Sequence, residues 1–90
     1  MPKRQLTEAQ RRRGKRLAQI LRERRVDQGL STEQLARAAN LSVETVRSIE
    51  GGRIVSPGFL TVSDLASVLR LRLDEIARQA NPADEGSITS

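Results

Sequence analysis

The side chains in this sequence that could carry chemistry are cations, hydroxyls and carboxylates. There is no His and no Cys, which excludes imidazole bases, thiol nucleophiles, disulfides and Cys/His zinc sites. The acidic residues are scattered over outward helical positions, and the sequence has neither a Gly-rich phosphate loop nor a cluster of metal ligands. We therefore expect a protein that is not an enzyme and that needs no metal and no cofactor.

Positive charge is concentrated in the first quarter of the chain. Residues 1–25 hold ten basic and two acidic side chains, whereas residues 26–90 hold six and nine. This asymmetry indicates a polyanionic partner, either nucleic acid or an acidic membrane surface. A helix lying on a membrane is disfavoured, because the apolar face of this segment is narrow and lacks Trp and Phe. No apolar run approaches the length of a membrane span and no secretory signal is present, so we expect a cytoplasmic protein.

The length and composition predict one small helical domain. The chain has 90 residues, of which 37% are apolar and only one, Phe59, is aromatic. Such a composition supports a small aliphatic core. The pattern of apolar residues and breakers predicts five helices and no strand. The expected fold is all-α, a compact five-helix bundle.

The first expected helix runs from Thr7 to about Gln28, with Leu17, Ile20 and Leu21 on its apolar stripe. Gly14 interrupts this segment. We therefore divide the chain into a basic N-terminal arm or helix extension at residues 1–13, a domain at residues 14–80 and a flexible tail at residues 81–90.

Two short helices joined by a tight turn are the most distinctive pattern. Ser31 and Gln34 form a capping-box pair that begins one helix, and Ser42 caps the next. Asn40 tolerates the left-handed backbone that a sharp turn needs. Core-facing positions on these helices leave a short polar face outward on residues 42–50, which fits the width of a DNA major groove. The alternative is a helical hairpin whose outer face meets only water.

The later helices are predicted from apolar spacing. Gly51 and Gly52 end the third helix, and Pro57 and Gly58 break the loop that follows. Apolar residues then recur at helical spacing in two segments separated by a connection at residues 70–72. The residues that show this spacing are Phe59, Val62, Leu65, Ala66, Leu69, Leu73, Ile76 and Ala77.

The strings LSTEQLA at residues 30–36 and LSVETVRSIEGGR at residues 41–53 resemble the helix-turn-helix of phage repressors and Cro, the Cro/cI or xenobiotic-response-element type. The likeness continues to residue 78. It implies a lambda-repressor-like domain that binds double-stranded DNA. It also implies that the protein is a sequence-specific transcriptional regulator, specifically a repressor. The alternative is an antitoxin or other module that uses the same fold to bind a toxin or another protein partner.

The resemblance also assigns roles to single residues. It places Val43, Glu44, Thr45 and Ser48 at base-reading positions of the helix at residues 42–50. Glu44 could accept from a cytosine amino group, but a carboxylate also repels phosphates, so the alternative is a solvated residue or one that disfavours wrong sites. Thr32, Arg47 and Arg53 fall at positions expected to contact phosphate. Arg47 could alternatively support Glu44, and the amides after Gly51-Gly52 are expected to complete a backbone clamp with Arg53. The basic run Arg11, Arg12, Arg13 and Lys15 is expected to lie on phosphates or in a minor groove, or else to be a solvated charge run. Arg25 and Glu50 fall where some relatives have a structural ion pair.

A single short recognition helix reads too few base pairs to select one site in a genome. We therefore expect a weak homodimer on a pseudo-palindromic operator. The resemblance implies an interface around the last helix and the loop before it, where Leu71, Leu73 and Ile76 are the apolar candidates.

Overall fold

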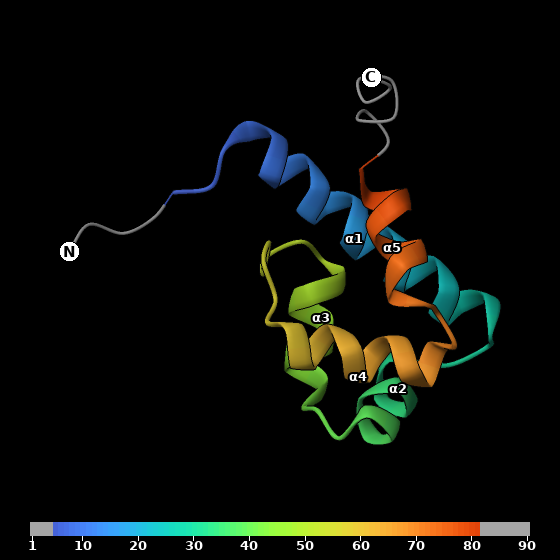
Figure 1. Cartoon of the computed structure of the whole chain (residues 1–90). Coiled ribbons are helices and arrows are strands. Elements are labelled where there is room, and N and C mark those ends of the chain that lie inside the picture. The colour runs from blue at the N-terminus through green and yellow to red at the C-terminus, as the bar shows by residue number, and fades with distance from the viewer. Residues whose placement is uncertain (1–4, 82–90) are drawn as a thin grey trace.

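The structure, a computed structural model, describes residues 5–81, and these residues contain five helices and no strand. The expectation of an all-α five-helix bundle is confirmed. The helices are α1 (Glu8–Asp27), α2 (Thr32–Ala39), α3 (Val43–Glu50), α4 (Phe59–Leu69) and α5 (Leu73–Ala80) (Figure 1). The proposed flexible tail lies outside the described residues except for Asn81.

Helix α1 begins at a complete capping box. The Thr7 hydroxyl accepts a hydrogen bond from the Gln10 amide at 3.0 Å, and the Gln10 side chain accepts from the Thr7 amide at 2.8 Å. From this cap the helix runs unbroken for 20 residues. The interruption expected at Gly14 is therefore wrong. Residues 8–13 continue α1, which agrees with the alternative of a helix extension.

Gly14 is needed in α1 because another segment packs directly on its backbone. A Cβ atom built at residue 14 would overlap the carbonyl oxygen and a methyl group of Val55. Val55 belongs to the loop between α3 and α4, so the missing side chain lets this loop lie against α1. The glycine marks a close approach of two backbones, which is a common reason for Gly inside a regular element.

This contact predicts an unusual response to Gly14→Ala. In a free helix the change stabilises by about 1 kcal/mol, but here we expect it to lower the free energy of unfolding by about 1–3 kcal/mol, as overpacking does. Gly58→Ala is the control for a methyl group added without overlap, because its φ is −66° and nothing lies within 4 Å of the new Cβ. Since Gly58 is the N-cap of α4 and Ala is a poorer cap, this control should cost at most about 1 kcal/mol. Urea denaturation of both variants tests this. Stabilisation by Gly14→Ala would show that the loop does not need the close approach.

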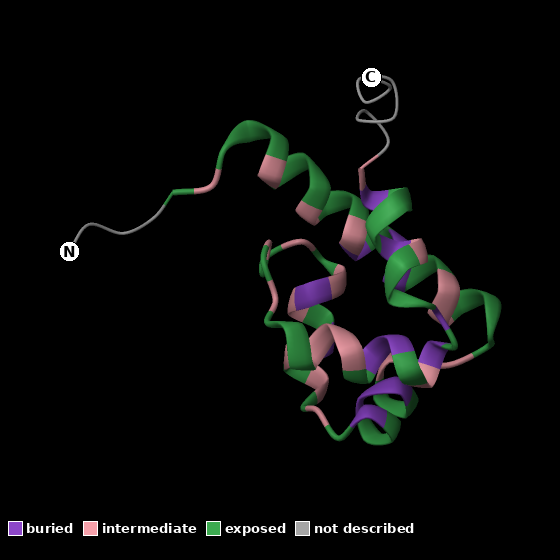
Figure 2. Ribbon diagram, in the orientation of Figure 1, coloured by how far each residue is buried: buried purple, intermediate pink, exposed green. Residues whose placement is uncertain are grey.

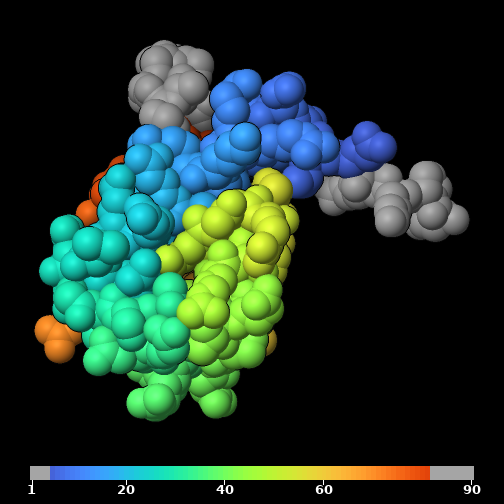
Figure 3. Space-filling model, turned by 180° about the vertical axis from the view of Figure 1, so that it is seen from behind, coloured from blue at the N-terminus to red at the C-terminus, as the bar shows by residue number. Residues whose placement is uncertain are grey.

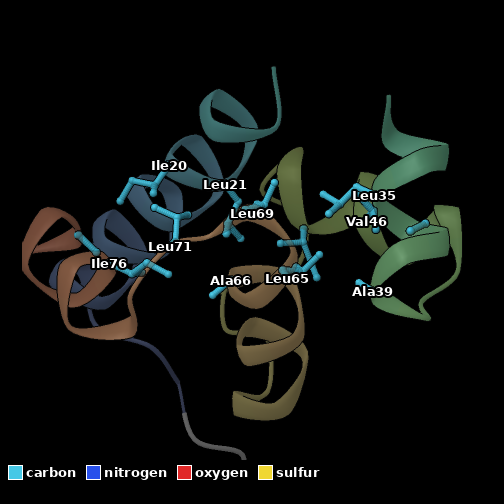
Figure 4. Close-up of a cluster of buried hydrophobic side chains, with 13 residues drawn as sticks. Ile20, Leu21, Leu35, Ala39, Val46, Leu65, Ala66, Leu69, Leu71 and Ile76 are labelled. Carbon is cyan, nitrogen blue, oxygen red and sulfur yellow. The ribbon is translucent and has the colours of Figure 1, made fainter. Parts of the chain in front are cut away.

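The core is aliphatic and is centred on α4. Figure 4 shows Leu65 and Leu69 of α4 lying between Ile76 on the α1–α5 side and Leu35 on the α2–α3 side, and all four are buried. Helix α1 contacts α3, α4 and α5, whereas α2 contacts α3 and α4. The short helices α2 and α3 are thus fixed to the rest of the molecule through α4 and α1 (Figure 1).

Two arginines of α1 bind the carbonyl ends of other helices. Arg16 donates two hydrogen bonds to the Gln79 carbonyl, at 3.3 and 3.0 Å. Arg24 donates to the carbonyls of Leu69 and Arg70, both at 3.0 Å. The last carbonyls of a helix lack backbone partners and carry partial negative charge, so a cation there is stabilising. Part of the basic excess of the N-terminal quarter therefore stabilises the fold.

The first turn of α4 leaves apolar groups on the surface. Phe59 shares the helical spacing of the α4 stripe but is 67% exposed, and Leu60 is 75% exposed (Figure 2).

The three apolar residues expected at the dimer surface differ in burial. Leu71 and Ile76 are buried in the core, and only Leu73 is exposed. The interface expected around α5 therefore loses two of its three apolar residues.

Candidate nucleic-acid interface

Local hydrogen bonds fix the turn between α2 and α3. The Ser31–Gln34 capping box is complete, and the Ser42 hydroxyl accepts from the Thr45 amide at 3.0 Å. Asn40 ends α2 in the left-handed conformation, at φ 59° and ψ 44°. The Leu41 amide then bonds back to the Ala36 carbonyl at 2.8 Å, as in a helix end of the Schellman type. The predicted capping roles of Ser31, Asn40 and Ser42 are confirmed. Ser42 sets where α3 begins.

Helix α3 is held by its inner face and presents a polar outer face. Val46 and Ile49 are fully buried. Among the residues expected to read bases, Glu44 is exposed, Thr45 and Ser48 are partly exposed, and Val43 is partly buried against the core. Figure 3 shows α2, α3 and the loop after α3 on one face of the molecule, with the N-terminal half of α1 along its upper edge.

Arg53 reaches back from the loop onto the outer face of α3. Its Nη2 donates to Glu44 Oε2 at 3.1 Å and to Ser48 Oγ at 2.7 Å. These two bonds use both hydrogens of one terminal nitrogen, and the remaining three N–H groups of the guanidinium form no bond within the described residues. The structure thus joins two expected base-reading residues through a residue expected to contact phosphate.

Arg47 makes a different pair from the one expected. Its Nη2 lies 2.9 Å from Glu33 Oε2 on α2, while Glu44 pairs with Arg53. The alternative that Arg47 supports Glu44 is therefore wrong. Arg47 instead links α3 to α2 through its ion pair with Glu33.

Glu33 lies at the N-terminus of α2, which favours its charged form. A hydrogen bond from its own backbone amide lowers the pKa of Glu33 most, the Thr32 hydroxyl adds to this, and Arg47 contributes less. Thr32 Oγ1 donates to Glu33 Oε1 at 3.2 Å. Because folding lowers this pKa, the contribution of Glu33 to stability is present above its unfolded pKa and is lost as pH falls through the folded one.

Two exposed cations of α1, Lys15 and Arg22, lie beside the end of α3. Arg11, Arg12, Arg13 and Lys15 are all exposed. Lys15 and Arg22 flank a shallow groove whose other wall is formed by Glu50, Gly51 and Gly52 at the end of α3. Arg22 was not among the residues predicted for the site, although its position, seven residues after Lys15, places both on one helical stripe.

The backbone amides after α3 are already bonded within the protein. The amides of Gly51, Gly52 and Arg53 donate to the carbonyls of Arg47, Ile49 and Ser48, at 2.9, 3.1 and 3.0 Å. The Ile54 amide also donates to the Ser48 carbonyl, at 3.1 Å. The expected clamp by amides after Gly51-Gly52 therefore has no free amide at Arg53 or Ile54. Within the described residues, the first amides of α2 and α3 at Thr32 and Val43 form no hydrogen bond and point outward from helix N-termini.

A buried ion pair ties the end of α3 to α1. Arg25 Nε lies 2.9 and 3.1 Å from the two carboxylate oxygens of Glu50, and Arg25 Nη1 donates to the Leu30 carbonyl at 2.7 Å. The Arg25 and Glu50 side chains are 13% and 7% exposed. The structure brings together the two residues expected to form a structural pair.

Comparison with known protein families gives one match to this chain. A family model described as a helix-turn-helix domain matches residues 16–79. The matched region includes α2 to α4, most of α1 and most of α5, whereas Arg11, Arg12, Arg13 and Lys15 precede it. A search of curated proteins found no match. Within residues 5–81, no helix is both long and apolar enough to cross a membrane.

Proposed function

The chain belongs to the helix-turn-helix domain family of DNA-binding domains, and we propose that it is a sequence-specific transcriptional repressor of the Cro/cI type. In this proposal α3 lies in the major groove of double-stranded DNA and reads base edges with Val43, Glu44, Thr45 and Ser48. The observation that carries the proposal is the polar outer face of α3, which is held rigidly by the buried Val46 and Ile49 and by α2.

Phosphate contacts would come from three places around α3. Thr32 lies at the N-terminus of α2, where an outward amide and the helix dipole favour an anion. Arg47 and Arg53 lie on the same face and keep unbonded N–H groups. These contacts would fix the position of the domain on the duplex without reading its sequence.

Arg11, Arg12, Arg13 and Lys15 would extend the phosphate contacts along the DNA. They lie on a regular helix, and a helix with its side chains is about 10–12 Å wide. The minor groove is only about 6 Å wide, so this segment fits against the phosphates outside the groove. The helical form of α1 therefore favours phosphate contact over insertion into a minor groove.

Selection of bound sequences from a random duplex pool tests the proposal. We expect the protein to enrich one motif and to shift it in a gel in the presence of excess random DNA. Thr45→Ala should weaken binding to the selected motif by about 1–3 kcal/mol, the usual worth of one base contact, and should leave binding to random DNA unchanged. Failure to enrich any sequence would contradict the proposal and favour a module that binds a protein partner.

We propose that the repressor binds its operator as a two-fold pair of chains. Ile54, Phe59 and Leu60 are exposed apolar side chains on the loop after α3 and the first turn of α4. This surface lies close to the end of α3 in the chain. A contact between two copies there would therefore link their α3 helices through only a few residues of each copy. Half-sites about 34 Å apart would follow from the two-fold symmetry. The area is small, so the pair would be weak without DNA.

Cooperative binding to a palindrome tests the pair. We expect two copies of the wild-type protein per palindromic duplex and cooperative filling of its half-sites. Phe59→Ser with Leu60→Ser should abolish the cooperativity but keep affinity for a single half-site. The control is Val26→Ser, since Val26 is also an exposed apolar residue, 55% exposed, but lies near the other end of the fold in α1. One copy per duplex at saturation would contradict the paired arrangement.

A further inference from the structure

Arg53 restricts which hydrogen bonds the outer face of α3 can offer. An arginine can only donate hydrogen bonds, so the Ser48 oxygen at 2.7 Å from Nη2 must act as the acceptor. The single hydroxyl hydrogen of Ser48 is then directed away from Arg53. The bond thus occupies one of the two acceptor positions of the Ser48 oxygen and leaves its hydrogen available for donation to a base.

Glu44 has the opposite role. Arg53 Nη2 occupies one position on Glu44 Oε2 at 3.1 Å, which leaves the other carboxylate oxygen free to accept. The cation also compensates the carboxylate charge, which would otherwise be repelled by DNA phosphates. Both side chains are exposed, 65% for Arg53 and 76% for Glu44, so the pair contributes little in the free protein. Its electrostatic effect increases when DNA displaces water from this face.

Cytosine is the base that matches the carboxylate. In the major groove cytosine presents the N4 amino donor, whereas adenine places the N7 acceptor beside its N6 amino group and thymine presents the O4 acceptor. The adenine amino group lies between two acceptors, N7 and the thymine O4, whereas the cytosine amino group has one acceptor beside it, the guanine O6. A carboxylate therefore meets less repulsion at cytosine. Glu44 and Ser48 are four residues apart, so their Cβ atoms are about 5–6 Å apart on one helical face. Since bases rise by about 3.4 Å, the two side chains reach positions one or two base pairs apart.

We propose that Arg53 is a positioning residue that fixes the hydrogen-bonding roles of the reading face. With Arg53 in place, Glu44 accepts from a cytosine amino group, and Ser48 donates to a guanine, adenine or thymine acceptor one or two base pairs away. This inference rests on the proposed function, and it names the kind of base-pair step that the same site recognises. Any phosphate contact of Arg53 would use its other N–H groups.

The experiment begins with the motif that the wild-type protein selects from a random duplex pool. Each C·G pair of the motif is changed in turn to T·A, which replaces the cytosine amino group by the thymine O4 acceptor. At one position we expect discrimination of about 5- to 100-fold, the range of a good base contact. Glu44→Ala should remove the discrimination at that position alone.

The Arg53→Met variant separates positioning from a phosphate contact. We expect it to reduce discrimination at the Glu44 position to that of Glu44→Ala, and to cause no further loss of discrimination when combined with Glu44→Ala. Arg72→Met is the matched control, because Arg72 also forms an exposed ion pair from a loop, with Asp74 at 3.4 Å, and makes no contact with α3. Circular dichroism confirms that each variant is folded.

Two results would overturn the inference. Full discrimination by Arg53→Met would show that Arg53 does not position Glu44, and a motif without any cytosine position sensitive to Glu44→Ala would show that Glu44 reads no amino group. A wild-type protein that enriches no motif is a different result, since it contradicts the proposed function itself.

Discussion

Replacing Glu50 by Ala is expected to lower the free energy of unfolding by about 3–5 kcal/mol. The change leaves the Arg25 guanidinium buried at 13% exposure without the carboxylate that it contacts at 2.9 Å. One hydrogen bond, to the Leu30 carbonyl, remains. A domain of this size has a total stability of about 5–15 kcal/mol, so a substantial fraction of the variant should be unfolded at 37 °C.

Urea denaturation followed by circular dichroism measures this effect, and two variants serve as controls. Glu33→Ala breaks the exposed Glu33–Arg47 pair, which has a similar distance of 2.9 Å, and should leave the free energy of unfolding nearly unchanged. Arg25→Met combined with Glu50→Leu removes both charges and should recover most of the stability. A destabilisation below about 1 kcal/mol for Glu50→Ala would show that Arg25 finds water or another partner when Glu50 is absent.

The features of the fold that the sequence predicted correctly depend on nearby residues. Ser31, Gln34 and Ser42 cap helices through bonds to residues three positions away. Asn40 takes a backbone conformation that few side chains tolerate. Such features are set by a few adjacent residues, so spacing alone identifies them.

The features that the sequence did not predict depend on contacts between distant segments. Gly14 costs about 1 kcal/mol in a helix, and the packing of Val55 on its backbone explains why a residue without a side chain lies there. Phe59 has helical spacing but lies in the first turn of α4, where it is mostly exposed. The spacing of apolar residues predicts which face of a helix packs on the core. It does not predict how far along the helix the neighbouring segments reach.

The pairing of charges in the site follows the same rule. Glu44 and Arg47 are three residues apart, a spacing at which helical side chains are neighbours. The fold instead offers Arg47 a carboxylate on α2 and offers Glu44 an arginine from the loop. The resemblance in sequence suggested which positions face DNA, but the partners of those side chains required the arrangement of α2, α3 and the loop.

Neutralising the exposed arginines of the first turns of α1 is expected to weaken DNA binding strongly at low salt. Arg11→Gln with Arg12→Gln removes two charges that precede the matched helix-turn-helix region. The slope of log affinity against log salt should flatten by about 0.9 for each phosphate that the variant no longer neutralises. Two such phosphates correspond to about 200-fold weaker binding at 50 mM salt, relative to a common value near 1 M. Gln is a good helix former, so α1 should remain intact.

Arg70→Gln with Arg78→Gln is the control for net charge. Both residues are exposed, and they lie at the end of α4 and on α5, of which little is visible on the face shown in Figure 3. The control removes the same charge and should change the salt slope much less. The motif selected by either variant should match that of the wild type, because phosphate contacts carry no sequence information. Equal salt slopes for the two variants would show that Arg11 and Arg12 act only through the overall charge. A slope that flattens for the first variant alone would place these arginines on the DNA backbone, beyond the helix-turn-helix itself.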